Sequence, residues 1–306
     1  MSIAKKLENF AKSLVLAPRV LLRYGRLRPT RTRLIGCDHW VHIDPTDRRA
    51  LKKLVYDPLR GRVSPPSAFW SAFNTHLQPA VAVDVGVNFG ECLFGARYSG
   101  NTHIFGFEAN PRIAPFLEKS RAEHPDGNRM TLALGLVSDQ AAEDVPFFVD
   151  PTWSGGASAV SSLNHSLGTL SFQLAARTLD SVIPQELVRG QCLLFKMDIE
   201  GYESRAFVGF RQTLDAAALT VGFIEFDSSY ITAAGESPEA YFQRLGERFD
   251  VYRLDDLSTQ KIIRVGDYST LPRSRASDGR IHTDLILVTH HSDPATWLAP
   301  SWSLRS

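Results

Sequence analysis

Hydrophobic runs alternate with glycine-rich and polar turns through the middle of the chain, a pattern typical of parallel α/β domains. Residues 81–85 and 104–107 are apolar runs with the length of strands that are buried on both faces. A glycine-rich turn, 86–90, follows the first run, and we predict a helix between this turn and the second run. The pattern therefore predicts a βαβ unit over 81–108.

The same alternation continues toward the C-terminus. Further strands are predicted at 130–137, 192–197, 220–226, 249–254 and 284–289, with short extra strands at 144–149 and 172–178 and helices at 111–124 and 202–211. The last two main strands have no full helix between them, so they can pair antiparallel. We therefore expect an α/β doubly wound sheet that is mostly parallel, with one antiparallel strand near its edge. Small residues fill 153–168, a candidate lid or substrate loop.

The remaining segments divide the chain around this domain. Residues 34–79 predict a short β element and two helices, an extension that packs on the core domain, 80–290. The last segment, 291–306, is interpreted as a surface tail. Residues 1–33 carry nine basic side chains against a single acid, with an apolar stripe at helical spacing formed by Ile3, Leu7, Phe10 and Leu14. This amphipathic segment could lie on an anionic membrane or dock on a partner, or it could pack on its own domain.

Composition and charge limit the classes of protein that fit. The 306 residues are 43% hydrophobic and 22% charged, as in an ordinary globular protein. A net charge of +1 with a pI near 7.8 argues against a nucleic-acid partner. The three cysteines are too scattered for a disulfide framework, which suits a reducing compartment. With neither a signal peptide nor a long apolar run, we expect a cytoplasmic protein, with 1–33 as a possible peripheral contact at the inner membrane surface.

The glycine turn and the acids beside it indicate the cofactor. The turn has the spacing G-x-N-x-G, and not the G-x-G-x-x-G that accommodates a pyrophosphate. Asp84 precedes the turn and Glu91 follows it, and two carboxylates would repel a pyrophosphate but attract an ammonium and a sulfonium. S-adenosylmethionine carries both of these cations. A nicotinamide-dependent oxidoreductase is the alternative, which the missing third glycine and Asp84 disfavour.

Six motifs in the right order resemble the FkbM-type S-adenosylmethionine-dependent methyltransferases. They are VDVGVNFGE (83–91), FGFEANP (105–111), SGGAS with SSL (154–163), RTLDSVI (177–183), FKMDIEGYE (195–203) and FIEFD (223–227). This resemblance implies a class I methyltransferase fold, Rossmann-like, with seven strands and helices on both faces. It also implies methyl transfer, usually to a hydroxyl oxygen of a sugar, glycolipid or natural product. A non-catalytic binding protein that retains the fold is a further alternative.

Candidate cofactor-binding residues follow from the strand ends of an open α/β sheet, where ligands bind. Asp84 and Gly86 are expected at the methionine end of the cofactor, and Glu108 at its ribose. Further candidates along the same edge are Asn88, Gly90, Asn110 and, beside the adenine, Gly135.

Candidate catalytic residues lie at the ends of the next strands. Asp198 is the preferred base for the acceptor hydroxyl, followed by Glu225 and Glu200, because neighbouring acids can raise a pKa toward that of a working base. Glu200 could instead cap the following helix, and Lys196 could neutralise the acids. His165 could be delivered by the small-residue loop. The acids could also hold Mg²⁺, although we do not expect a metal. The expected partner is a small-molecule or glycan-linked acceptor; the oligomeric state is not predicted.

Overall fold

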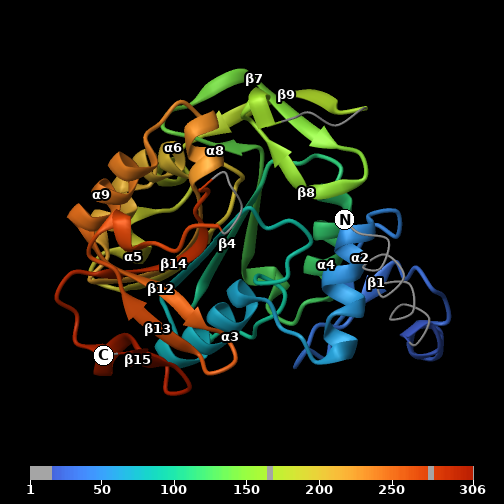
Figure 1. Cartoon of the computed structure of the whole chain (residues 1–306). Helices are drawn as coiled ribbons and strands as arrows, with labels where there is room; N and C mark the ends of the chain where they lie inside the picture. The colour runs from blue at the N-terminus through green and yellow to red at the C-terminus, as the bar shows by residue number, and fades with distance from the viewer. Residues whose placement is uncertain (1–15, 164–167, 275–278, 306) are drawn as a thin grey trace.

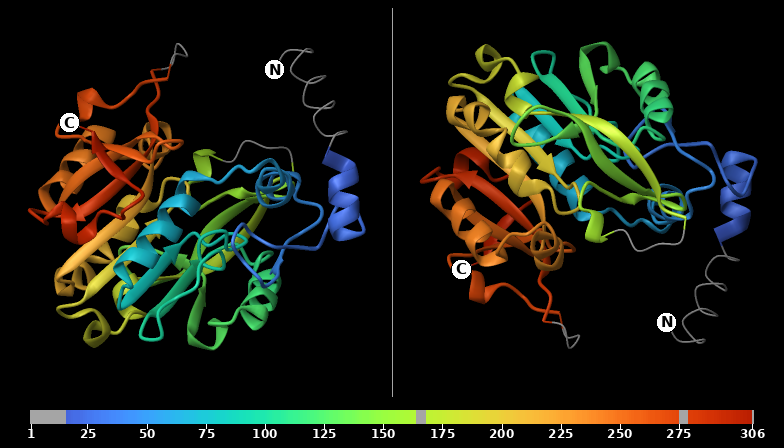
Figure 2. Two further views of the ribbon diagram at one scale, coloured as in Figure 1. Left: turned by 90° about the horizontal axis from the view of Figure 1, so that it is seen from below. Right: turned by 90° about the horizontal axis from the view of Figure 1, so that it is seen from above.

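A nine-stranded sheet with helices on both faces forms the centre of the computed structural model, which describes residues 16–163, 168–274 and 279–305 (Figures 1 and 2). In chain order the strands are β3 (Val81–Val85), β4 (His103–Glu108), β5 (Met130–Leu134), β10 (Cys192–Met197), β11 (Leu219–Asp227), β12 (Phe249–Asp256), β13 (Lys261–Arg264), β14 (His282–Thr289) and β15 (Ser303–Arg305). Across the sheet they run β15-β13-β12-β14-β11-β10-β3-β4-β5.

Seven of these strands form the sheet that the sequence predicts. β5, β4, β3, β10 and β11 are mutually parallel, whereas β14 is antiparallel to both β11 and β12. The expected α/β, mostly parallel sheet with one antiparallel strand is therefore confirmed. β13 and β15 extend its edge beyond the predicted seven strands.

Helices cover both faces because the side chains of each central strand alternate between two hydrophobic layers. In β3, Ala82 faces one layer, while Val81, Val83 and Val85 face the other. The first layer is covered by α3 (Pro65–Leu77), α4 (Ala114–Glu123) and α10 (Pro294–Trp297). The second is covered by α5 (Gln185–Val188), α6 (Glu203–Val208), α7 (Arg211–Ala216), α8 (Ser228–Ala233) and α9 (Pro238–Arg248).

The N-terminal extension has the elements expected between 34 and 79. Residues 16–24 are helical, and β1 (Arg31–Thr32) pairs with β2 (Val41–His42). The next helix starts as α2 (Arg48–Leu51), continues as a π-helical turn (Lys52–Tyr56) and ends in a 3-10 turn (Pro58–Arg60). The predicted stripe over Ile3 to Leu14 lies outside the described residues. Within the described part of the chain, no helix is long and apolar enough to cross a bilayer.

A second sheet of four strands stands beside the main one. Its strands are β6 (Leu136–Val137), β7 (Ala142–Asp150), β8 (Trp153–Ser158) and β9 (Leu170–Arg177), in the order β6-β9-β7-β8 (Figure 1). The continuous strand predicted at 130–137 is wrong, because Gly135, at a φ of 131°, separates β5 from β6. The loop predicted at 153–168 is also wrong in its first part, because residues 153–158 form strand β8.

Four further short segments have 3-10 structure. They are 3-10 turns at Gly127–Arg129, Ser161–Leu163, Leu179–Ser181 and Tyr268–Thr270. The helix predicted at 202–211 is in fact two helices, α6 and α7, which meet at Gly209 and Phe210.

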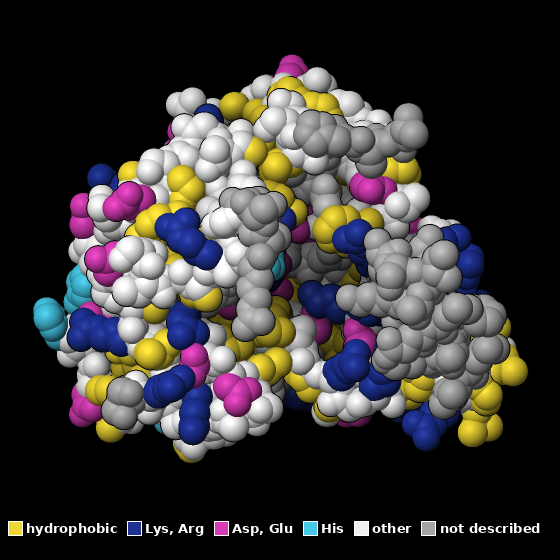
Figure 3. Space-filling view, viewed as in Figure 1, with side chains coloured by type: hydrophobic (Ala, Val, Ile, Leu, Met, Phe, Trp, Pro, Cys, Tyr) yellow, Lys and Arg dark blue, Asp and Glu magenta, His cyan; other side chains and the backbone are white. Residues whose placement is uncertain are grey.

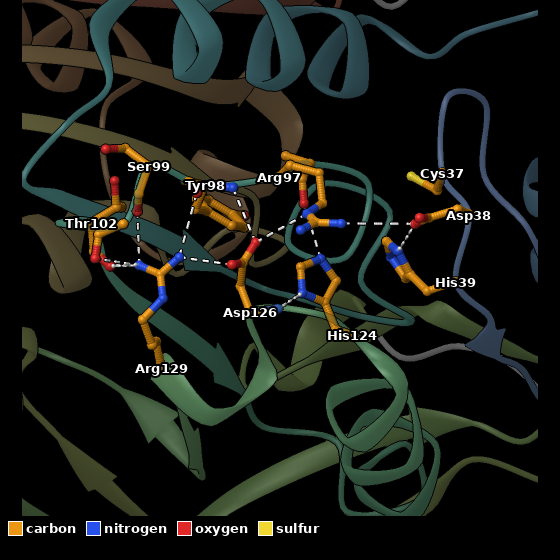
Figure 4. Close-up of polar contacts among 12 residues, drawn as sticks. Cys37, Asp38, His39, Arg97, Tyr98, Ser99, Thr102, His124, Asp126 and Arg129 are labelled. Carbon is orange, nitrogen blue, oxygen red and sulfur yellow. Dashed lines mark hydrogen bonds and ion pairs between the residues drawn. The ribbon is translucent and has the colours of Figure 1, made fainter.

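The helix predicted between β3 and β4 is absent: turns occupy 88–94, and 95–99 has no regular secondary structure. Gly90 has a φ of 82°, which an α-helix cannot contain. Carbonyl oxygens that a helix would pair with its own backbone must find other donors. The carbonyl oxygens of residues 94–97 accept hydrogen bonds from the side chains of His39, Cys37, His124 and Asn74, in that order. Those of Tyr98 and Ser99 accept from Arg129 (Figure 4).

His124 occupies a central place in this network. Its Nε2 donates to the carbonyl oxygen of Ala96 (2.9 Å), and its Nδ1 accepts from the backbone N–H of Asp126 (2.9 Å), as Figure 4 shows. One nitrogen donates while the other accepts, so this arrangement needs the neutral ring. Burial, followed by the neighbouring His39, lowers the pKa of His124 to about 4.

The lowered pKa of His124 predicts a loss of stability on acidification. Between its ordinary pKa of 6.5 and about 4, the unfolded chain binds a proton on His124 that the folded chain does not. The contribution of the neutral ring is therefore complete above 6.5 and is lost as the pH falls through this window. We expect a loss of about 1 kcal/mol of unfolding free energy on going to about pH 5, after allowance for solvent screening.

Urea denaturation of the wild type and of His124→Asn at both pH values measures this effect. Asparagine offers an acceptor near the position of Nδ1 but does not titrate, so this variant should be less stable at neutral pH and lose less on acidification. An equal loss in both proteins would show that His124 is not responsible.

The C-terminal segment is not the surface tail predicted for 291–306. Trp297 in α10 is fully buried, and Trp302 is 4% exposed. Both indoles pack against Phe73 of α3, with ring centroids 6.3 and 5.4 Å apart, and β15 then joins β13. Burial of two indoles removes a large apolar area from water and so anchors the segment to the domain. The sequence did not indicate this packing because the helix and strand of the segment are too short to show a hydrophobic periodicity.

Candidate active site

A cavity of about 560 Å³ opens at the carboxyl ends of the central parallel strands, the edge where open α/β sheets bind ligands. β3, β4, β10 and β11 supply one wall, and β8 with α2 and the π-helical turn that follows it supplies the other. Figure 3 shows acidic and basic side chains gathered around a hollow in this face of the molecule. Its volume suits a ligand of cofactor size with room for part of an acceptor.

Asp84, at the carboxyl end of β3, presents an unsatisfied acceptor to this cavity. Its side chain is 1% exposed, and its Oδ1 receives no hydrogen bond from any described residue. The nearest cation, Lys196 Nζ, is 3.4 Å from Oδ1 but donates to the carbonyl oxygens of Gly86 (2.6 Å) and Val85 (3.3 Å). Burial raises the pKa of Asp84, against the influence of Lys196. A buried oxygen in this state fits a ligand ammonium.

Glu108, at the end of β4, is held in place by the backbone. Its Oε2 accepts from the N–H of Asn88 and its Oε1 from the N–H of Asn110, both at 2.7 Å. Burial raises the pKa of Glu108, and the two N–H groups oppose that rise. Each oxygen keeps a further lone pair, so the fixed carboxylate can accept from two adjacent hydroxyls, as a ribose presents. Together with Asp84, these hydrogen-bond acceptors fit S-adenosylmethionine.

The turn after β3 brings the backbone close to the next strand. Gly86 has a φ of 80°, and a Cβ there would collide with the carbonyl oxygen of Asp198, so only glycine fits. Asn88 also has a left-handed backbone, with a φ of 51°, and its Oδ1 accepts from Ser154 Oγ at 3.1 Å. The turn therefore connects the cofactor side of the cavity to β8.

Four of the seven predicted cofactor residues line the cavity, namely Asp84, Gly86, Asn88 and Glu108. Gly90, Asn110 and Gly135 do not. Asn110 acts through its backbone on Glu108, while Gly90 packs against the ring of Phe94. Beside Gly135, the side chains of Leu136 and Val137 reach the cavity instead.

The structure brings together the three acids predicted for catalysis. One carboxylate oxygen each from Asp198, Glu200 and Glu225 lies within 4.8 Å of the others. Burial, together with the charge of Asp198, raises the pKa of Glu200 well above its ordinary value and that of Glu225 to about 10. The three carboxylates therefore lie close together at the place where an acceptor would meet the cofactor. The fourth candidate, His165, lies outside the described residues.

Neighbouring side chains decide two alternatives for this cluster. Glu203, and not Glu200, caps the turn, since its carboxylate accepts from the N–H groups of Ile199 (2.8 Å) and Gly201 (3.0 Å). Lys196 lies between the two sides of the site, with its Nζ 3.4 Å from Asp84 and 3.9 Å from Asp198. Burial works to lower the pKa of Lys196, but these two carboxylates outweigh burial and raise it.

Sequence reasoning missed the wall opposite the acids. The guanidinium of Arg49 stacks over the ring of Trp153 at 3.8 Å, and both residues line the cavity. The N–H of Ser154 donates to Asp47 at 2.8 Å, so β8 is attached to α2 at two points. Trp153 begins the loop that the sequence marks as a candidate lid, but nothing in the sequence pairs it with an arginine more than 100 residues earlier.

The strand order, the acid at the end of β3 and the acid at the end of β4 together define a class I S-adenosylmethionine-dependent methyltransferase. The sequence model of the methyltransferase FkbM domain matches residues 84–254, more than half of the chain. The protein therefore belongs to the FkbM methyltransferase family. No curated protein matches the chain.

Solved structures with a similar backbone fold include several methyltransferases. A putative O-methyltransferase from Klebsiella pneumoniae is 13% identical, with a TM-score of 0.38, and 81% of this chain aligns with 92% of that one. For methyltransferase FkbM from Methylobacillus flagellatus the identity is 15% and the TM-score 0.37, over 93% of this chain and 60% of that one. O-methyltransferase TomG from Streptomyces achromogenes, solved with S-adenosylmethionine, is 12% identical, with a TM-score of 0.39, and 81% of this chain aligns with 92% of that one. The family assignment rests on the sequence match and not on these similarities.

Proposed function

We propose that this methyltransferase acts on oxygen, and that its acceptor is a hydroxyl of a sugar, glycolipid or natural product. The observation that supports this proposal is the crowding of Asp198, Glu200 and Glu225 within 4.8 Å at the cavity. A hydroxyl must lose its proton when it becomes an ether, and carboxylates at the site of attack can receive it. Carboxyl groups that carry protons can also orient a hydroxyl by hydrogen bonding.

Asp198 is the base in this proposal. Lys196 Nζ stands 3.9 Å from Asp198 Oδ2, so the carboxylate form of Asp198 has a cation beside it. With a pKa of about 10, Glu225 holds a proton at neutral pH, and burial with the charge of Asp198 raises the pKa of Glu200 in the same direction. Both residues serve as orienting groups. The acceptor oxygen gains a carbon–oxygen bond as a carbon–sulfur bond breaks, and its proton passes to Asp198.

Asp84 and Glu108 hold the methyl donor in this proposal. When bound, S-adenosylmethionine supplies an electrophilic methyl group on a sulfonium. Asp84 Oδ1 accepts from the ammonium of the donor, and Glu108 accepts from its ribose hydroxyls. These two residues would hold the donor at the ends of β3 and β4, beside the end of β10, which Asp198 follows.

Labelling identifies both the acceptor and the atom that is methylated. The full chain is incubated with S-adenosylmethionine carrying a ¹³C methyl group and with fractionated cell extracts, and each product is examined by NMR. We expect a new methyl resonance on oxygen, and no product with the Asp198→Asn variant. A methyl group on nitrogen, carbon or sulfur would refute O-methylation. Cofactor binding without transfer in any fraction would favour a binding protein.

A further inference from the structure

Residues 16–35, here called the N-terminal surface, place hydrophobic and basic side chains together at the edge of the molecule. The helix at 16–24 lies away from the central sheet in both views of Figure 2. Its inner face is buried, with Leu16 at 4% and Val20 at 0% exposure. Its outer face carries Leu22, which is 91% exposed. The helix is thus anchored on one side and free on the other.

Four large hydrophobic side chains of this surface face solvent. They are Leu21 (52% exposed), Leu22 (91%), Leu27 (50%) and Ile35 (52%). A single exposed leucine is ordinary, but four of the nine large hydrophobic side chains that are exposed in the described chain lie within these 20 residues, and this clustering marks a binding surface. Figure 3 shows hydrophobic side chains beside Lys and Arg side chains at this edge of the molecule.

The charge of the N-terminal surface is uniformly positive. Its exposed basic residues are Arg19, Arg23, Arg26, Arg28, Arg31 and Arg33, and no Asp or Glu occurs between 16 and 35. Arg31 is the one arginine among them with an ion pair inside the described chain, 3.9 Å from Glu123. Arg31 and Arg33 also stack on Trp40, each 4.5 Å from the ring centroid. Arg23 lies over the ring of Tyr24 at 5.5 Å. Arg19, Arg26 and Arg28 have neither an ion pair nor a ring contact in the described chain, and they are available to an anionic partner.

We propose that the N-terminal surface binds an anionic lipid bilayer. Exposed leucines need an apolar phase, and arginines at the same depth need anionic head groups, a combination that a membrane interface offers. Nucleic acid would satisfy the arginines but leave the leucines in water. The proposal is independent of which atom the enzyme methylates, because no residue of this surface lines the cavity.

Sedimentation of the full chain with vesicles tests this proposal. We expect binding to phosphatidylcholine vesicles that contain phosphatidylserine, and little binding to phosphatidylcholine alone. Substituting glutamine at Arg19, Arg26 and Arg28 together should weaken partitioning on the order of 100-fold, since each arginine near the surface contributes about fivefold. Leu22→Ser should weaken it about tenfold, without a cost in stability, because this side chain is solvated in the free protein.

A matched control removes the same charge elsewhere. Lys119, Arg189 and Arg211 are exposed, and no ion pair involves them in the described parts of the chain, so their triple glutamine variant should bind vesicles as the wild type does. Equal binding to neutral vesicles, or equal weakening by the control, would overturn the proposal. So would an unchanged Leu22→Ser variant together with tight binding to RNA, which would assign the arginines to nucleic acid.

Discussion

Replacing Asp84 by asparagine is expected to weaken binding of S-adenosylhomocysteine about 100-fold. The substitution keeps the shape of the side chain but removes the negative charge whose Oδ1 has no hydrogen-bond partner within the described structure. A ligand ammonium would then face a neutral amide in a buried site, at a cost of about 3 kcal/mol. Isothermal titration calorimetry of the purified protein measures the change in Kd directly.

Asp284 supplies the control for this experiment. It lies on β14, and burial, then the charge of Asp198, raises its pKa to about 6, yet it does not line the cavity. Asp284→Asn therefore also removes a carboxylate from the sheet, in this case a half-buried one, but it should leave the Kd within about threefold of the wild type. If both variants lost binding equally, the effect of Asp84 would be structural and its place in the site would be wrong.

Replacing Asp198 by asparagine should have the opposite profile. We expect kcat to fall about a thousandfold, because an amide cannot accept the hydroxyl proton. Binding of S-adenosylhomocysteine should remain within about threefold, since Asp84 and Glu108 stay in place. Turnover is measured with the acceptor found by labelling, and binding by calorimetry on the same preparation.

The separation of kcat from cofactor affinity distinguishes the possible roles of Asp198. A parallel fall in both would show that the Asp198 side chain also supports the cofactor side of the site, where its carboxylate lies 3.9 Å from Lys196 Nζ. Normal turnover would transfer the role of base to Glu225 or Glu200. Asp284→Asn should again keep both quantities near the wild-type values, because Asp284 does not line the cavity.

The sequence was sufficient for the central sheet because its strands are apolar, long and bounded by glycines or acids. Strands 81–85 and 192–197 occur with the bounds that were predicted. Predictions of secondary structure were wrong where contacts between residues distant in the sequence outweigh the local conformational preference. The segment 87–99 has the length of a crossover helix, but the side chains of His39, His124 and Arg129 satisfy its carbonyls instead.

The same distinction applies to the candidate site. Asp84, Glu108 and Asp198 were predictable because acids at the ends of adjacent parallel strands must converge at one edge of the sheet. The opposite wall was not predictable, since Arg49 and Trp153 meet only when the second sheet folds over that edge. Likewise, the burial of Trp297 and Trp302 depends on α3, more than 200 residues earlier in the chain.

Calorimetric titration of the wild-type chain with S-adenosylhomocysteine, and separately with NAD, tests the central claim most directly. We claim that the carboxylates closing β3 and β4 receive the amino-acid and ribose moieties of a methyl donor. This claim predicts saturable binding of one S-adenosylhomocysteine per chain and no measurable binding of NAD. Saturable binding of NAD, with no heat from S-adenosylhomocysteine, would contradict it.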